Sequence, residues 1–254
     1  MIIDTHCHID LYKVPLDVVH DAEAQHITTI AVTYLPSHFR LAQHHLRTHS
    51  YVRPALGLHP LAVQDHARDL PLFKTLCVQE DFIGEIGLDF SGAGKASRST
   101  QETSFAIVLE CIRDRPRFIS LHSRGAEDVV LAHLKRAGLV NAVFHWFSGS
   151  RAQLIRILDA GHLLSVNTSM IRTAKWRDFI RLVPHEAILT ESDGPFAKLD
   201  SRPALPTDMP IIIRWLAESW EQQPQEVEEQ VARNCRRVPV LAAFAACRGT
   251  RQAT

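Results

Sequence analysis

The chain has no paired-cysteine pattern and no long apolar segment. Its five cysteines are odd in number and none stands in a C-x-x-C spacing, so we expect neither a disulfide framework nor a thiolate zinc site. No stretch approaches the roughly 18 apolar residues of a membrane span, and no basic segment followed by an apolar one marks a secretory signal. These absences predict a protein of the reducing cytoplasm with no membrane partner.

An excess of charge of either sign is also missing. Lysine and arginine together number 28, as do aspartate and glutamate, so no overall positive field attracts polyanions. Any nucleic acid should therefore be bound locally, at an end, and not along a groove that contacts many phosphates. With 254 residues, 46% of them hydrophobic, the chain is long enough for one large domain, and no linker or repeat divides it.

What the sequence does contain is a regular alternation of short apolar runs with segments of helical length. Strands are expected at residues 1–9, 28–35, 51–59, 82–89, 118–123, 141–147, 162–169 and 187–193. Amphipathic helices are expected at 100–115 and 126–137, after a flexible small-residue loop at 91–99, and extra helices from about residue 209, at 210–221, 224–237 and 238–247. Eight strand-helix units favour an α/β fold, a single-domain (β/α)8 TIM barrel over residues 1–254, over an open parallel sheet.

Ionisable side chains interrupt the apolar strands near their C-terminal ends. In the first case, strand alternation would turn Asp4, His6 and His8 to one face, so that the two imidazoles can converge on one metal ion. The later cases are His59, Glu85, Asp89, His122, His145 and Asp193. Because all strands of a barrel deliver their C-terminal ends to one mouth, these groups should meet there.

A metal centre is the simplest reason to bury these groups together. Each later histidine taken alone is more often a satisfied core residue, and Glu85 could cap a turn. Buried polar groups without partners cost roughly 1–3 kcal/mol each, however, and a shared metal ion removes that cost. The N/O ligand set suits Zn, Mn, Co or Mg, and the lack of cysteine ligands argues against a structural zinc. Glu85 is a natural bridge between two ions about 3.5–4 Å apart in a hydrolytic site.

Together these motifs resemble those of the TatD-type metal-dependent deoxyribonucleases, which are amidohydrolase-like TIM barrels. The resemblance covers nearly the whole chain and rests on ordered blocks: Asp4-x-His6-x-His8, Gly57-Leu-His59-Pro60, Gly84-Glu85-Ile-Gly87-Leu-Asp89, Gln101 with Phe105, His122-Ser-Arg124, His145-x-Phe147-Ser148-Gly149, Glu191-Ser-Asp193 and Asn234-Cys-Arg236. Such a series in order is far more specific than any one motif.

The resemblance implies two divalent metal ions, of Zn, Mn or Mg, and a set of site residues. One ion would be held by His6, His8, Glu85 and Asp193, and the other by Glu85, His122 and His145. The resemblance further implies that His59 lies at the substrate end and that Arg124 grips a phosphate. The implied activity is 3′–5′ exonuclease trimming of single-stranded DNA ends.

Trp146 departs from the family pattern, which usually has a small residue or cysteine at this position. Its indole could stack on a base at the barrel mouth or pack at the rim. The sequences 5–12, 145–146 and 191–196 resemble those of the QatD branch, encoded with bacterial Qat anti-phage systems. This second resemblance implies other Qat defence proteins as partners.

The predicted reaction is hydrolysis of a phosphodiester by a metal-activated water. Asp193 would bind a metal and accept the proton of the water, and His59 would protonate the leaving oxygen or donate a hydrogen bond. Asp4, one step deeper on the ligand face, would support the ligands without binding a metal. Two alternatives stay open: an amidohydrolase or lactonase acting on small substrates, and a structural metal-bound subunit of a defence complex. Glu85 in place of a bridging lysine, and Arg124 beside His122, favour phosphate chemistry.

Overall fold

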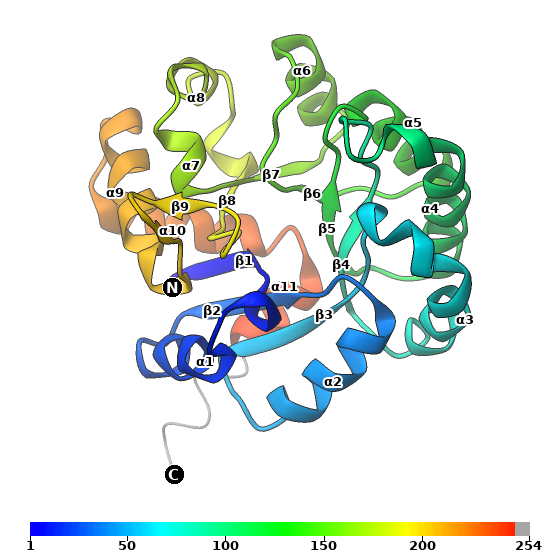
Figure 1. Cartoon of the computed structure of the whole chain (residues 1–254). Helices are drawn as coiled ribbons and strands as arrows, with labels where there is room; N and C mark the ends of the chain where they lie inside the picture. Colours follow the sequence, from blue (N-terminus) through cyan, green and yellow to red (C-terminus); the bar gives the residue numbers. More distant parts are fainter. Residues whose placement is uncertain (247–254) are drawn as a thin grey trace. The chain divides into compact units, whose positions relative to one another are not determined.

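The computed structural model describes residues 1–246, whose strands form one eight-stranded sheet in sequence order (Figure 1). The strands are β1 (Ile3–Cys7), β2 (Thr28–Val32), β3 (Val52–Leu58), β4 (Phe82–Gly87), β5 (Phe118–His122), β6 (Val143–Phe144), β7 (Leu163–Val166) and β8 (Ile188–Thr190). The first strand is bonded to the last, since Thr5 Oγ1 donates to the carbonyl oxygen of Thr190 at 3.0 Å. The fold is the (β/α)8 TIM barrel that the sequence predicts.

Helices follow the strands in turn. They are α1 (Pro15–Ala24), α2 (Pro36–Leu46), α3 (His66–Leu76), α4 (Arg98–Ile112), α5 (Glu127–Ala137), α6 (Arg151–Asp159), α7 (Thr168–Ile171), α8 (Ala174–Phe179), α9 (Met209–Trp220), α10 (Pro224–Cys235) and α11 (Pro239–Ala246). The chain forms two compact units. The first unit comprises residues 1–31, 46–53 and those from 165 onward, and the second unit comprises residues 32–45 and 54–164.

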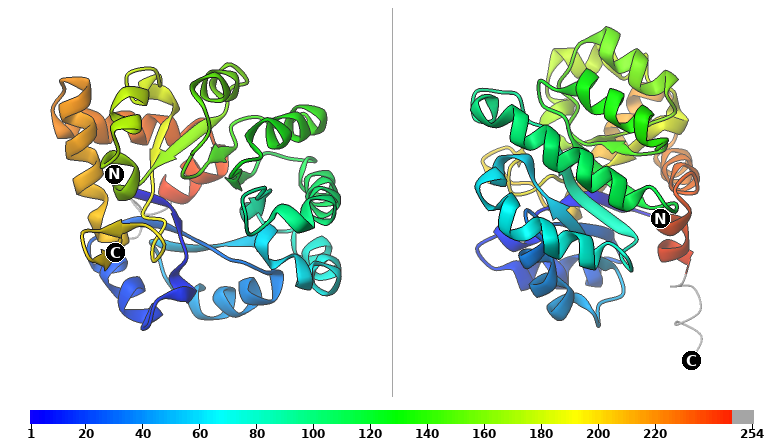
Figure 2. Two further views of the ribbon diagram at one scale, coloured as in Figure 1. Left: turned by 45° about the horizontal axis from the view of Figure 1, so that its top comes forward. Right: turned by 90° about the vertical axis from the view of Figure 1, so that its right-hand side faces the viewer.

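The first unit holds β1, β8 and the helices that follow β8. In it α9 and α10 lie side by side (Figures 1 and 2), with Leu216 of α9 buried. Asn234 of α10 donates from Nδ2 to the carbonyl oxygens of His185 and Ile188, both at 2.7 Å. These bonds tie α10 to the start of β8 and so fix the strand that leads to Asp193.

The second unit holds the central strands and the helices packed on them. Figure 2 shows α3, α4 and α5 side by side. In the sheet Phe82 of β4 pairs with Phe118 of β5, and Ile83 with Ile119. The buried residues of α4 recur at three- and four-residue intervals, as expected for a helix with one apolar face, and include Phe105, Val108, Leu109 and Ile112.

Several elements differ from the predicted ones. An antiparallel hairpin of β9 (Lys198–Leu199) and β10 (Arg202–Pro203) follows β8. Neither the hairpin nor α7 was predicted, whereas α8 lies in the segment of helical length expected between residues 169 and 187. The loop at 91–99, expected to be flexible, contains a short 3₁₀ turn at Lys95–Ser97 and is bonded to α4, where Gln101 Nε2 donates to Gly94 O at 3.0 Å. The predicted helix 238–247 is α11, and residue 247 lies outside the described residues.

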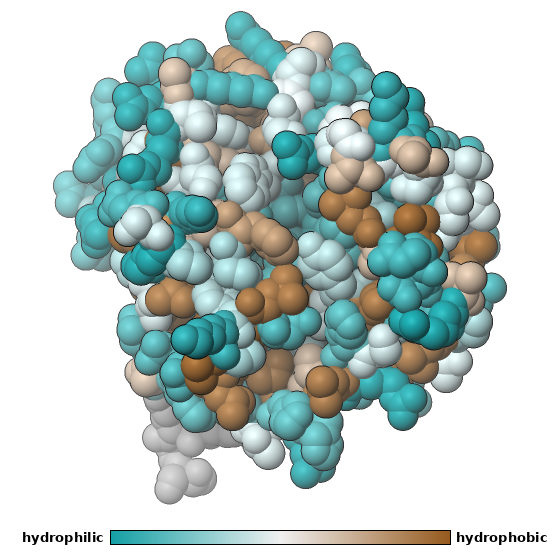
Figure 3. Space-filling view, in the orientation of Figure 1, coloured by the Kyte–Doolittle hydropathy of each residue, from teal (hydrophilic) through white to brown (hydrophobic). Residues whose placement is uncertain are grey.

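The exposed surface is mixed in character. No helix within residues 1–246 is long and apolar enough to cross a membrane. On the face drawn in Figure 3, hydrophobic residues stand singly or in small groups among hydrophilic ones. Among the described residues only one exposed large hydrophobic side chain is aromatic, that of Phe196, which is 46% exposed.

Candidate metal centre

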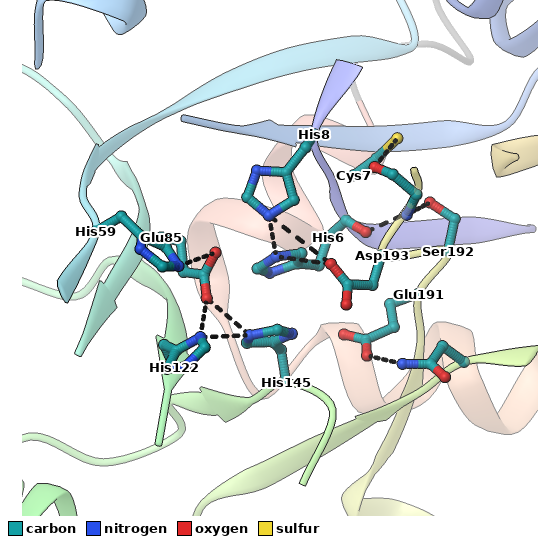
Figure 4. A network of polar contacts seen from close by, with 12 residues as sticks. His6, Cys7, His8, His59, Glu85, His122, His145, Glu191, Ser192 and Asp193 are labelled. Carbon is teal, nitrogen blue, oxygen red and sulfur yellow. Dashed lines mark hydrogen bonds and ion pairs between the residues drawn. The ribbon is translucent and has the colours of Figure 1, made fainter. Parts of the chain in front are cut away.

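Two histidines of the opening motif and an aspartate that follows β8 form a first ligand group, which lies wholly in the first unit (Figure 4). The Nε2 atoms of His6 and His8 are 3.2 Å apart, and Asp193 Oδ1 lies 3.6 Å from the first and 3.7 Å from the second. All three residues are buried. Ligand atoms about 2.0–2.1 Å from a tetrahedral zinc ion are roughly 3.3 Å apart, so this spacing suits one divalent ion.

An irregularity in β1 helps to aim the two histidines. The pairing of β1 with β2 shifts between Asp4 and Cys7, where β1 contains one residue more than its partner strand. Strict alternation of side chains, which the sequence analysis assumed, is therefore interrupted. His6 and His8 nevertheless converge, because His8 lies just beyond the end of the strand.

Asp4 supports this group from beneath, as predicted. Its Oδ1 accepts the backbone N–H of His6 at 3.1 Å and that of Ser192 at 2.9 Å. Asp193, which has a left-handed φ of 44°, donates its backbone N–H to His6 O at 2.8 Å. Burial raises the pKa of Asp4 to about 7, against the opposing effect of its hydrogen bonds. These contacts bind the ends of β1 and β8 to each other.

Glu85 is the centre of a second ligand group, which lies wholly in the second unit. Between Ile83 and Ile86 strand β4 advances three residues while β5 advances two, from Ile119 to Leu121, so Glu85 stands in a β-bulge. Bulges turn a side chain away from the direction that regular pleating would give it, and they are frequent beside active sites. Gly84 before Glu85 is compatible with a bulge, but a glycine near a strand end does not by itself predict one.

Three histidines surround the Glu85 carboxylate (Figure 4). Its Oε1 lies 2.6 Å from His122 Nδ1 and 2.8 Å from His145 Nε2, and these two nitrogens are 3.4 Å apart. Its Oε2 lies 3.4 Å from His59 Nε2. The two shorter separations are hydrogen-bond distances, so Glu85, His122 and His145 are close enough to share one ion in place of the protons between them, and the structure brings His59 to the same carboxylate.

Asp89 lies on the other side of the His122 ring. The Nε2–H of His122 donates to Asp89 Oδ2 at 2.8 Å, so Nδ1, which lies against Glu85 Oε1, is the nitrogen that would bind an ion once it has lost its hydrogen. The pKa of His122 is about 9: burial alone would lower it, but the hydrogen bonds and charges of Asp89 and Glu85 raise it by more. The pKa of Asp89 is about 2: burial alone would raise it, but the hydrogen bonds from His122 and Ser91 lower it by more. The sequence analysis gave Asp89 no role, although a carboxylate at the end of the Glu85 strand was a usable signal.

The tautomer of His59 is fixed by the backbone. Its Nδ1 accepts the N–H of Leu61 at 3.1 Å, so in the neutral ring Nε2 carries the hydrogen and directs it toward Glu85. Behind it His66, a buried residue that the sequence analysis missed, has its Nε2 2.9 Å from His59 O. Burial lowers the pKa of His66, which keeps that ring neutral. This geometry favours His59 as a hydrogen-bond donor over a metal ligand.

The two other residues predicted to contact substrate lie in the second unit. Arg124 is exposed, two residues beyond His122, and its carbonyl oxygen accepts the N–H of Phe90 at 2.9 Å. Trp146 directly follows His145, is partly buried and has a left-handed φ of 35°. A bulky residue seldom adopts this conformation, which is more frequent at functional sites. Both residues stay candidates for substrate contact.

Glu191 is a buried carboxylate that belongs to a quoted motif but had no predicted role. It accepts hydrogen bonds from Asn167 Nδ2 at 2.9 Å and from the hydroxyl of Ser165. Asn167 in turn caps α7, because its side-chain oxygen accepts the N–H of Met170 at 3.0 Å. These bonds join the ends of β7 and β8 two residues before Asp193 and so hold the turn that carries Asp193 in place.

Comparison with known proteins identifies the family. The sequence matches the TatD related DNase family over residues 3–239. The chain belongs to this family. The crystal structure of YjjV, a TatD homologue from Escherichia coli K12, is similar to this chain with a TM-score of 0.81 and 26% sequence identity, covering 92% of this chain and 95% of that one. The predicted TatD resemblance and barrel are thereby confirmed.

Named nucleases are among the relatives of this TatD-family chain. The 3′-5′ ssDNA/RNA exonuclease TatD of Klebsiella pneumoniae is 32% identical over 167 residues, which is 61% of this chain and 63% of that protein. Deoxyribonuclease TATDN3 of Homo sapiens is 25% identical over 213 residues, or 76% of this chain and 78% of that protein. Family membership makes the TatD-family chain a metal-dependent hydrolase, as predicted.

Proposed function

We propose that this TatD-family chain hydrolyses phosphodiester bonds at single-stranded DNA ends. The observation that carries the proposal is the pair of buried ligand groups, each composed of two histidines and a carboxylate with ligating atoms 2.6–3.7 Å apart. Sites of this composition bind the divalent ions of hydrolases. The relatives' names, deoxyribonuclease and ssDNA/RNA exonuclease, support a nucleic acid substrate.

The proposed cofactor is a pair of divalent ions, and the donor atoms fit Zn, Mn or Mg. One ion would be held by His6, His8 and Asp193, the other by His122 and His145, and both by Glu85. The barrel topology supports the shared ligand because the C-terminal ends of all strands point toward one face of a TIM barrel. When bound, the two ions would activate a water and neutralise charge on the phosphoryl oxygens.

We propose that Asp193 accepts a proton in the reaction and that His59 donates a hydrogen bond. The carboxylate of Asp193 would accept the proton that the attacking water loses. The Nδ1 of His59 already accepts the backbone N–H of Leu61, so Nε2 is the atom of this ring that carries a hydrogen toward the site. His59 would therefore stabilise a phosphoryl or leaving oxygen by donating its Nε2–H.

Arg124 and Trp146 are the proposed contacts to the substrate in the second unit. The exposure of Arg124 immediately beyond a proposed ligand suits its guanidinium for bidentate binding of a phosphate. Trp146, next to His145, offers an indole for stacking on a base. The net charge of +0 favours a substrate held at its end over one that lies along many phosphates.

The nuclease proposal is tested with labelled single- and double-stranded DNA, incubated with Mg or Mn and with a chelator. Asp193→Asn should lower the rate of nucleotide release about 10²–10⁴-fold, since the amide cannot accept the proton and binds metal weakly. Asp178→Asn, an exposed carboxylate change on α8, is the matched control and should retain the wild-type rate. Activity that survives the chelator or Asp193→Asn would contradict the proposal.

The two alternative functions are separated by further assays. An amidohydrolase or lactonase would cleave small amides, esters or lactones faster than a model phosphodiester, whereas we expect the opposite order. Partnership with other Qat defence proteins stays a prediction from the sequence resemblance. Co-purification from cells that carry a complete Qat operon tests it, and a structural subunit would protect those cells even with Asp193→Asn.

A further inference from the structure

Phe196 is an exposed aromatic ring beside a proposed metal ligand. It is the one exposed Phe, Tyr or Trp side chain among residues 1–246, with 46% of its surface accessible. Its ring centroid lies 5.1 Å from that of His8, with the two planes at 86°. The exposed part of the ring adds little to the stability of the fold, and it is accessible to a ligand.

The turn that carries Phe196 is held firmly within the first unit. The N–H of Ala197 donates to Asp193 O, and the N–H of His8 donates to Gly194 O, both at 2.9 Å. A Cβ on Gly194 would lie 2.1 Å from the carbonyl oxygen of Ala204, so the turn packs against that segment without spare room. The backbone that carries the ring is therefore fixed only three residues from Asp193, the proposed proton acceptor.

An exposed lysine follows Phe196 closely in the sequence. Lys198, two residues on, is exposed, and its backbone is fixed to α7 because its N–H donates to Ser169 Oγ and its carbonyl oxygen accepts from Thr168 Oγ1, both at 3.1 Å. An aromatic ring that stacks on a base, together with a cation that follows the backbone, is the combination with which proteins hold single-stranded nucleic acid.

We propose that Phe196 is a base-stacking subsite that holds the nucleobase of the nucleotide being removed. The inference rests on the proposed nuclease function and deepens it, because it predicts that the enzyme recognises a base and not merely a phosphodiester. The rival role for the ring is packing against His8 alone, in which case its loss would affect all substrates equally.

The test compares an ordinary single-stranded oligothymidylate with one whose terminal nucleotides at both ends carry tetrahydrofuran in place of the base. Wild type should prefer the ordinary strand by about five- to a hundredfold in kcat/KM, the range that corresponds to stacking on one base. Phe196→Leu keeps an apolar side chain beside His8 and should lose most of that preference, while Phe196→Tyr should keep it.

The preference is a ratio of two rates, so a lower folded fraction of a variant cancels from it. Phe179→Leu, the same change at a half-buried ring on α8, should retain both the wild-type rate and the wild-type preference. An unchanged preference in Phe196→Leu, or an equal loss of rate on both strands, would overturn the inference. A wild-type protein that cleaves neither strand would instead overturn the proposed nuclease function.

Discussion

His122 illustrates how one side chain can be prepared for a metal by its neighbours. Its ring lies between two carboxylates, with Nδ1 2.6 Å from Glu85 Oε1 and Nε2 2.8 Å from Asp89 Oδ2. A carboxylate behind a metal-binding histidine sets the tautomer and increases the basicity of the nitrogen that faces the ion. We therefore interpret Glu85 as the ligand and Asp89 as the residue that orients His122.

Replacing Asp89 by asparagine tests this division of roles. The amide can still accept a hydrogen bond but carries no charge, so we expect metal affinity to fall about 10- to 100-fold while excess metal restores most of the activity. A metal titration of the hydrolysis rate measures both effects. Asp159→Asn, an exposed carboxylate at the end of α6, should leave the titration unchanged. If saturating metal restored no activity to Asp89→Asn, a direct catalytic role for Asp89 would replace the orienting one.

That the proposed ligand residues lie close together was predictable, because each is an ionisable group at the end of an apolar strand. His6, His8 and Asp193 converge as the motifs indicated. The supporting residues were less predictable, since a buried histidine such as His66 has no distinguishing pattern in sequence. Its partner is the carbonyl oxygen of His59, and only the folded chain reveals such a contact.

At the scale of elements, the bulge in β4 and the close packing of β5 position the second ligand group. Gly87 ends β4 with a φ of 142°, and a Cβ there would lie 2.0 Å from the carbonyl oxygen of His122. The two backbones can approach this closely only because Gly87 has no side chain. The approach brings Asp89 and His122 within hydrogen-bonding distance.

Gly87→Ala should therefore lower the free energy of unfolding by about 2–4 kcal/mol, through strain and displacement of β5. For a chain of this size we expect a drop in Tm of roughly 5–15 °C, measured by thermal unfolding followed by circular dichroism. The matched control is Gly92→Ala, where a Cβ would meet nothing within 4 Å. Equal unfolding temperatures for the two variants would show that the strand approach is not constrained at Gly87.

The alternation of strands and helices gave most of the elements, whereas their short additions were missed. The β9–β10 hairpin consists of two-residue strands, and α7 has only four residues. Segments of this length show no hydrophobic period that could be read from sequence. The hairpin is bonded to α7 through side chains such as Ser169 and Thr168, contacts that depend on the fold.

For the whole molecule, composition indicated a globular protein without a membrane span, and the motifs indicated the family. The β1-to-β8 order of the sheet and the match to the TatD related DNase family over residues 3–239 agree with what the motifs implied. The single domain, the cytoplasmic location and the Qat partners stay predictions. We claim a stoichiometry of two metal ions per chain, because two ligand groups of two histidines and one carboxylate each should bind two ions.

Elemental analysis of the purified chain, after equilibration with Zn or Mn and removal of excess metal, tests that claim most directly. We predict about two ions per chain for wild type and about one for His8→Ala and for His145→Ala, each of which removes a ligand from one group only. The exposed histidine change His38→Ala is the control and should leave two ions bound. A wild-type chain that binds a single ion, or variants that keep the wild-type content, would contradict the account.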